Sequence, residues 1–164
     1  MRLLANIAAL ALVALFITGP AFADSYRITV YTADTKKAGT DATVKIRLKG
    51  TRHLSRVMIL DPPGNSFERA QWDTQVLAIR DLGQLTEIVL SHDGGGKGSG
   101  WLPQTVYVTN LTTGDRADFG VSRWIYSRVY TDFGVSSRHK YKKSELERER
   151  KKAAAAMKRQ KKRK

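Results

Sequence analysis

Alternation between hydrophobic and polar residues is the dominant pattern in the middle of the chain. In Tyr26–Thr32, the apolar residues Tyr26, Ile28 and Val30 alternate with polar or charged ones, and Thr43–Lys49 repeats the pattern. A period of two is typical of a β-strand with one buried face. Similar patterns predict further strands at Leu54–Leu60, Gln75–Arg80, Leu85–His92, Thr105–Thr109 and Arg116–Phe119.

Turn-forming residues separate these segments, at Asp61–Asn65, at Asp81–Gly83, in the glycine-rich run 94–100 and at Thr113–Asp115. From Asp24 to Ser137 the chain has no stripe of apolar residues at helical spacing, and a sandwich of roughly a hundred residues fits that length. The pattern therefore predicts one all-β domain, an antiparallel β-sandwich, over residues 24–137.

The N-terminus has the features of an export signal. Arg2 is followed by the apolar stretch Leu3–Ile17, the helix-breaking pair Gly19-Pro20 and the small-x-small site Ala21–Ala23. This order predicts a signal peptide over residues 1–23 and a mature chain that begins at Asp24. The alternative is an uncleaved membrane anchor, because the apolar stretch approaches spanning length. We expect an exported protein, periplasmic or secreted, with association to the cell envelope left open.

The positive charge is concentrated at the C-terminus. The whole chain carries a formal net charge of +14. Residues 138–164 hold 14 Lys and Arg against 3 acidic residues, a net charge of +11, whereas residues 24–137 hold 14 against 12. A nearly neutral domain with a cationic tail indicates an anionic partner, either a lipid or another envelope polyanion. Nucleic acid is disfavoured because export separates the protein from it.

The tail at 138–164 is expected to be helical or disordered. Ser144 and Glu147 have the spacing of a capping box, and Ala153–Ala156 favours a helix, but the apolar residues are too few for a buried face. A solvated extension without a specific target is the alternative. The candidate anion-binding residues at its end are Lys158, Arg159, Lys161, Lys162, Arg163 and Lys164.

Two glycine-containing loops each carry a carboxylate between predicted strands. Asp41 lies in the loop 38–43 and Asp93 begins the glycine run. Carboxylates beside glycines in such loops can present oxygen ligands to a hard cation such as Ca²⁺. The alternative is that each aspartate caps its own turn.

The order of motifs along the chain resembles the PLAT domain, the lipoxygenase-homology β-sandwich, over about residues 26–126. The resemblance implies two four-stranded antiparallel sheets with functional loops at one end. It also implies binding to membranes or protein partners, often with calcium. The matching pieces, in order, are Tyr26–Asp34, Ala38–Ala42, Val44–Gly50, Phe67–Ala70, Asp73, Leu82–Leu85, Ile88, His92-Asp93, Gly98, Trp101, Val106–Val108, Thr113-Gly114, Phe119 and Trp124.

The resemblance also implies a set of calcium ligands. In the family, the loop that contains Gly39 and Asp41 supplies a glycine carbonyl and a carboxylate. Asp93 is the best-matched second acid, and Asp34 and Glu68 are further candidates.

This chain departs from calcium-binding relatives at three positions. Lys36 and Lys37 stand where such relatives often have an acid, and the glycine run contains Lys97 but no further carboxylate. We therefore expect weak Ca²⁺ binding, with a dissociation constant of about 10⁻⁴–10⁻³ M, or none.

Tryptophans are the candidate membrane-binding residues. Family members insert loop tryptophans into a bilayer interface, where an indole suits the mixed environment. Trp101 follows the glycine run, and Trp72 interrupts a polar segment. The alternative for Trp101 and Trp124 is a place in the core.

The sequence offers no catalytic constellation. Lys97 is not in a Walker frame, and Ser99 is not in G-x-S-x-G. His53, His92 and His139 are scattered, and the chain has no cysteine.

The sequence therefore predicts a non-catalytic exported binding module that docks on membrane lipid or an envelope polyanion. The calcium-facing loops would make the contact, and the polybasic tail would assist them. The alternative is a protein-interaction module for an exported partner, with the tail only solubilising or anchoring it. The oligomeric state is left open.

Overall fold

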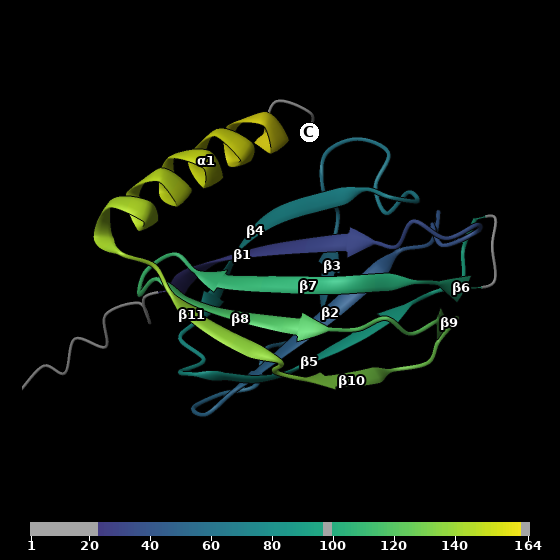
Figure 1. Ribbon diagram of the computed structural model, residues 1–164, viewed down its shortest axis with the longest axis horizontal. Coiled ribbons are helices and arrows are strands. Elements are labelled where there is room, and N and C mark those ends of the chain that lie inside the picture. Colours follow the sequence, from purple (N-terminus) through teal and green to yellow (C-terminus); the bar gives the residue numbers. More distant parts are fainter. Residues whose placement is uncertain (1–22, 97–99, 162–164) are drawn as a thin grey trace, which may run out of the picture.

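Two antiparallel β-sheets pack face to face in the computed structural model, which describes residues 23–96 and 100–161 (Figure 1). The predicted antiparallel β-sandwich is confirmed. The elements are β1 Ala23–Thr32, β2 Val44–Gly50, β3 Met58–Leu60, β4 Trp72–Arg80, β5 Leu85–His92, β6 Gly100–Trp101, β7 Pro103–Asn110, β8 Asp115–Gly120, β9 Ile125–Tyr126, β10 Thr131–Gly134, β11 Ser137–Lys140 and α1 Lys143–Lys161.

The first sheet has five strands in the order β11-β8-β7-β1-β4, and the second has four in the order β10-β5-β2-β3. The resemblance implied two sheets of four strands, and β11 is the strand that widens the first sheet. It pairs with β8 from Ser137 to Lys140, so the sheet extends past the boundary predicted at residue 137. A third pairing, β6 with β9, closes the end of the sandwich to which β1 points (Figure 1).

The core lies between the two large sheets. The alternating residues of β1 that were predicted to be buried, Tyr26, Ile28 and Val30, are almost fully buried. They meet the matching residues of the second sheet, because every second side chain of a strand points to the same face.

Strand bounds differ from the prediction where pairing is short. The strand predicted at Leu54–Leu60 is only Met58–Leu60, and Leu54 makes an isolated bridge to Lys49. The strand predicted from Gln75 begins earlier, at Trp72, because Trp72 pairs with Tyr31. Strands β6, β9, β10 and β11 were missed because two to four residues are too few to display a period.

The predicted C-terminal helix is confirmed as α1, but the predicted capping box is wrong. The helix begins at Lys143, and the carboxylate of Glu145 accepts a hydrogen bond from the backbone N–H of Lys142, at 2.9 Å. Glu145 therefore closes the first turn, in place of the predicted Ser144 and Glu147 pair.

Some predictions fall outside the described residues. They include residues 1–22 of the predicted signal peptide, and the candidate tail residues Lys162, Arg163 and Lys164. The side chains of Arg159 and Lys161 are likewise not described. Within the described ranges, no helix is both long and apolar enough to cross a membrane.

Candidate functional site

The loops that carry Asp41 and Asp93 lie against each other at one end of the sandwich, which we call the loop end. The backbone N–H of Asp93 donates to the carbonyl of Thr43, at 3.3 Å. A Cβ added to Gly96 would overlap the side chain of Asp41, and Gly96 has a φ of +73°. Glycine at this position therefore allows the second loop to reach the first.

Asp93 caps the turn that it begins. Its Oδ1 accepts hydrogen bonds from the backbone N–H of Thr43, at 3.0 Å, and of Gly95, at 2.9 Å. Hydrogen bonds from Thr43 and from the Gly95 amide lower the pKa of the Asp93 carboxyl from its ordinary 3.8 to about 2. Asp93 thus keeps its negative charge far below neutral pH and holds the two loops together.

Gly39 allows a third segment to pack beneath the Asp41 loop. A Cβ at Gly39 would lie 3.0 Å from the carbonyl oxygen of Phe67. The buried Asp73 fixes that segment, since its Oδ2 accepts a hydrogen bond from the Phe67 N–H, at 2.8 Å, and its Oδ1 accepts one from the Gln71 amide. Sequence reasoning quoted Asp73 as part of a motif but did not find this role.

The predicted ligand set is only partly brought together. Asp34 pairs with Arg69, at 2.6 Å, and Glu68 accepts a hydrogen bond from Asn65, at 2.7 Å. Among the described residues, no group of three or more Asp, Glu, His or Cys side chains could hold a metal ion. Asp34 and Glu68 therefore do not join the other predicted ligands in one cluster.

The residues present fit at most a weak calcium site. Ca²⁺ takes six to eight oxygen ligands, and its affinity rises with the number of anionic ones. Here Asp41 and Asp93 are the carboxylates on adjacent loops, so backbone carbonyls such as that of Gly39, and water, would have to supply the remaining oxygens.

The prediction that Trp101 is a membrane-binding residue is wrong. Its side chain is 0% exposed, its indole N–H donates to Thr32 Oγ1 at 3.1 Å, and its ring meets Phe67 edge-on at 5.3 Å. The alternative of a core position is confirmed. Trp101 instead supports the loops from below.

Trp72 is 52% exposed. It lies on the outer face of the five-stranded sheet, with its ring 4.7 Å from that of Tyr31 and 5.5 Å from that of Tyr107. The guanidinium of Arg116 lies 3.8 Å from the centre of the Tyr107 ring and extends the stack. Trp72 is therefore accessible, but it is held by neighbouring rings.

Three exposed residues at the loop end were missed by sequence reasoning: Tyr126, Val129 and Tyr130. Their segment packs against the Asp93 loop, because the Ser127 hydroxyl donates to the Asp93 carbonyl, at 3.0 Å. The nearby Arg128 is also exposed and donates its backbone N–H to the His92 carbonyl, at 2.8 Å. The available signal was an apolar and aromatic cluster directly before a short strand.

At the opposite end of the sandwich, which we call the helix end, α1 packs on the five-stranded sheet. Leu146 and Ala153 are buried, and Ala153 joins Val76 and Leu111 in a small apolar cluster. The expectation that this segment has no buried face is therefore wrong, because Leu146 and Ala153, two helical turns apart, both face the sandwich.

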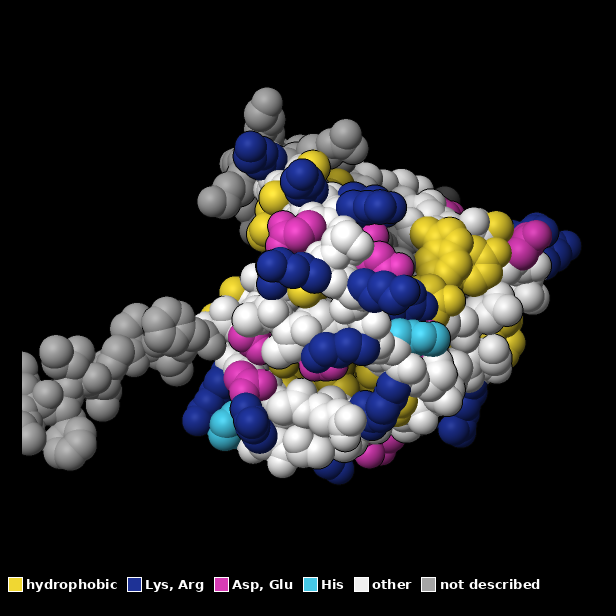
Figure 2. Space-filling model, turned by 60° about the vertical axis from the view of Figure 1, so that its left-hand side comes forward, with side chains coloured by type: hydrophobic (Ala, Val, Ile, Leu, Met, Phe, Trp, Pro, Cys, Tyr) yellow, Lys and Arg dark blue, Asp and Glu magenta, His cyan; other side chains and the backbone are white. Residues whose placement is uncertain are grey.

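Polar contacts add to this packing. Glu149 forms a largely buried ion pair with Arg27, and the guanidinium of Arg150 donates to the carbonyls of Leu111, at 2.8 Å, and Thr112, at 3.1 Å. Among the described cationic side chains of α1, those of Arg148, Lys151, Lys152 and Lys158 are exposed. Figure 2 shows Lys and Arg side chains spread over this side of the molecule, with acidic side chains between them.

Comparison with known proteins identifies the sandwich. The family described as the PLAT/LH2 domain matches residues 26–133. The chain is similar to the human lipoxygenase homology domain-containing protein 1, with 32% identity over 103 residues, which is 63% of this chain. The chain spans only 5% of the length of that relative.

Solved structures give the same result. One is a coral 8R-lipoxygenase, whose calcium activation is attributed to a C2-like domain. It is 28% identical to this chain with a TM-score of 0.63, over 68% of this chain and 17% of that one. A calcium-dependent 11R-lipoxygenase is 30% identical with a TM-score of 0.57, over 70% of this chain and 17% of that one. Strand β11 and helix α1 lie beyond the residues that the family matches.

Proposed function

The chain belongs to the PLAT/LH2 domain family, whose domains are non-catalytic modules that bind lipid or protein, and on this premise we propose that it docks on membranes through its loop end. The proposal includes export to the periplasm or beyond, in line with the signal-like sequence at residues 1–23. The membrane lipid is the ligand, and the loop end is the surface that meets it.

The exposure of Tyr126, Val129 and Tyr130 carries the proposal. These side chains are 55%, 49% and 63% exposed on one short segment. Tyrosine suits a bilayer interface because its ring is apolar and its hydroxyl can stay hydrated. The exposed Arg123 and Arg128 lie on the same segment and would favour anionic headgroups.

Calcium would act as a weak ligand of the same end. Asp41 and Asp93 lie on adjacent loops beside the exposed tyrosines, so a bound Ca²⁺ would supply positive charge at the membrane contact. Such a cation can also share its open coordination positions with lipid phosphate oxygens.

The cationic face of α1 would contribute at long range. Helix α1 starts at the end opposite the loops (Figure 1), so its lysines attract an anionic surface without making the same contact as Tyr126. This contribution should weaken between about 0.1 M and 1 M salt, where the Debye length falls from about 10 Å to about 3 Å.

Co-sedimentation with liposomes of mixed anionic and zwitterionic phospholipid, with and without millimolar Ca²⁺, tests the proposal. Replacing Tyr126, Val129 and Tyr130 together by serine should weaken binding by about tenfold or more, because their apolar surface no longer leaves water. The matched control replaces Leu54 and Ile59 by serine. These residues are 55% and 54% exposed but lie on the β3 side of the sandwich.

The variants Asp41→Asn and Asp93→Asn test the proposed role of calcium. Asparagine at position 93 can still accept the hydrogen bonds from Thr43 and Gly95, so the turn should be kept. Both variants should abolish any calcium-dependent increase in binding and leave calcium-independent binding in place. Unchanged liposome binding by the triple serine variant would rule out docking through the loop end.

A protein partner is the second candidate. It is favoured by the exposed Leu54, Val57 and Ile59 around the short strand β3. If the wild-type chain binds no liposome, and a protein that binds the wild-type chain does not bind the Leu54 and Ile59 variant, this second candidate replaces the first.

A further inference from the structure

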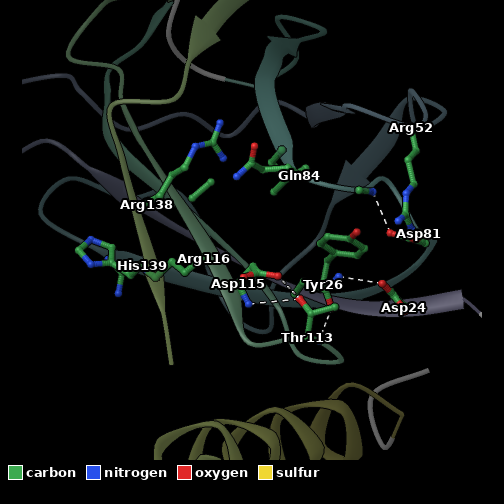
Figure 3. A pocket seen from close by; sticks show the side chains of 14 residues that line it. Asp24, Tyr26, Arg52, Asp81, Gln84, Thr113, Asp115, Arg116, Arg138 and His139 are labelled. Atoms are coloured by element: carbon green, nitrogen blue, oxygen red, sulfur yellow. Dashed lines mark hydrogen bonds and ion pairs between the residues drawn. The ribbon is translucent and has the colours of Figure 1, made fainter. Parts of the chain in front are cut away.

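The helix end contains a cavity that the loop-end function does not use (Figure 3). Its volume is about 530 Å³, which is within the range of small-molecule sites. Residues of β1, β8 and β11 line it, together with Leu85 of β5, Asn110 of β7 and the connections before β3, β5 and β8. Because β11 lies beyond the family match at residues 26–133, one wall of the cavity is outside that match.

One side of the cavity presents a cation. Arg138 on β11 and Gln84, directly before β5, point toward one another in Figure 3. Within the described residues, Arg138 forms no ion pair, and the Gln84 amide has no hydrogen-bond partner. Their free N–H groups form a donor pair suited to a carboxylate.

The opposite side presents an acid. In Figure 3, Asp24 lies on the other side of the Tyr26 ring from Arg138, whereas Asp115 lies on the same side as Arg138. Asp24 is only 8% exposed and accepts a hydrogen bond from the Asn110 amide, at 2.7 Å, yet no cation of the described chain pairs with it. Asp115 is held by Lys140, at 2.7 Å.

The middle of the cavity is apolar with one hydroxyl. Leu85 and Ala117 line it, both buried. Burial raises the pKa of Tyr26, so its hydroxyl stays protonated; the oxygen accepts a hydrogen bond from the Leu82 N–H, at 3.2 Å.

We propose that this cavity binds a small dipolar molecule, with a carboxylate on Arg138 and Gln84 and an ammonium group facing Asp24. A charge taken out of water without a counter-charge is costly. Asp24 is nearly buried and has no cation of the described chain beside it, so an ammonium group there compensates its charge. Arg138 is exposed at the rim of the cavity, where it can hold the carboxylate of the same ligand. A ligand with a single charge engages only one of these two residues.

The test is an NMR titration of the ¹⁵N-labelled full chain with three probes of similar size. ε-Aminocaproate carries both charges, caproate only the carboxylate, and hexylamine only the ammonium group. We expect ε-aminocaproate to shift the amide signals of Arg138, Gln84 and Tyr26 in a saturable manner. Caproate and hexylamine should bind about tenfold more weakly, because each lacks one charged hydrogen bond.

Two variants test which residue holds each charged group of the ligand. Arg138→Gln and Asp24→Asn remove one charge each and should each weaken ε-aminocaproate binding by about tenfold. The asparagine can still accept the hydrogen bond from Asn110, so the wall of the cavity should be kept. Arg123→Gln, an exposed arginine of the loop end, is the control and should leave binding unchanged.

Three results would overturn the proposal. They are no saturable shift with ε-aminocaproate, equal affinity for caproate or hexylamine, and full affinity in Arg138→Gln with intact amide signals for β11. Liposome binding by the loop end should be unaffected by either cavity variant, so the two functions fail independently.

Discussion

The loop end and the helix end of the sandwich are built in different ways. At the loop end, three connecting segments are tied to one another by the buried carboxylate of Asp73, the turn-capping Asp93 and the core indole of Trp101. At the helix end, the short strand β11 pairs with β8, and α1 is held on the sheet by the Arg27–Glu149 ion pair and a few apolar contacts around Ala153.

The two ends also differ in how much of each lies within the family match. The loop end lies within the residues that the PLAT/LH2 family matches, and its exposed side chains stand on a rigid support. The helix end lies partly outside that match and contains the cavity, and residues 138–164, which include α1, carry a net charge of +11. We therefore expect the loop end to depend on core packing and the helix end to depend on peripheral docking.

The largest expected loss of stability comes from a substitution at the loop end. Trp101→Ala should lower the free energy of unfolding by about 3–5 kcal/mol, because it removes a fully buried indole and its hydrogen bond to Thr32. Chemical denaturation followed by circular dichroism measures this loss. Trp101→Phe keeps most of the volume and should cost less. Equal, small losses in both would mean that Trp101 does not support the loops.

At the helix end, Leu146→Ala should lower the free energy of unfolding by less, about 2 kcal/mol, because Leu146 lies outside the main core and packs near the turn at Gly114. The loss should appear locally, as faster amide hydrogen exchange in α1 with little change in the core strands. Leu54→Ala, at an exposed leucine, is the control. Uniformly faster exchange in every strand would show that α1 and the sandwich unfold together.

Trp72→Ala should have a smaller effect, about 1 kcal/mol, because the half-exposed ring loses its contacts with Tyr31 and Tyr107 but leaves no cavity in the core. Denaturant unfolding measures it. A loss as large as that of Trp101→Ala would place Trp72 among the core residues.

The smallest effect is a pH dependence at the loop end. The pKa of Asp93 in the folded chain is about 2, below its ordinary 3.8, so its hydrogen bonds stabilise the fold above about pH 4. This contribution is lost as the pH falls from about 4 to 2. An NMR titration of the Asp93 carboxyl should give a midpoint well below 3.8, and a midpoint at 3.8 would contradict the observed turn cap.

The sandwich could be predicted from the sequence because long strands such as Tyr26–Thr32 display their period. The short strands could not, because their pairing is decided by distant partners such as β8 for β11. Tertiary contacts also decide which carboxylates lie near one another. The sequence therefore could not show that Asp34 and Glu68, which contact Arg69 and Asn65, are not part of one cluster with Asp41 and Asp93. The docking of α1 was missed because alanine, arginine and glutamate make its contact, rather than a hydrophobic stripe.

Strand β11 also determines what the first sheet offers to other copies of the chain. Without it, β8 would be an edge strand with unpaired backbone groups, next to the buried Ala117 and Phe119. With it, the edge is four residues long, fully exposed and rich in charge, and short charged edges resist edge-to-edge aggregation. A chain that ends before Ser137 should therefore self-associate, whereas one that ends after Lys140 should lose α1 but keep its protected edge.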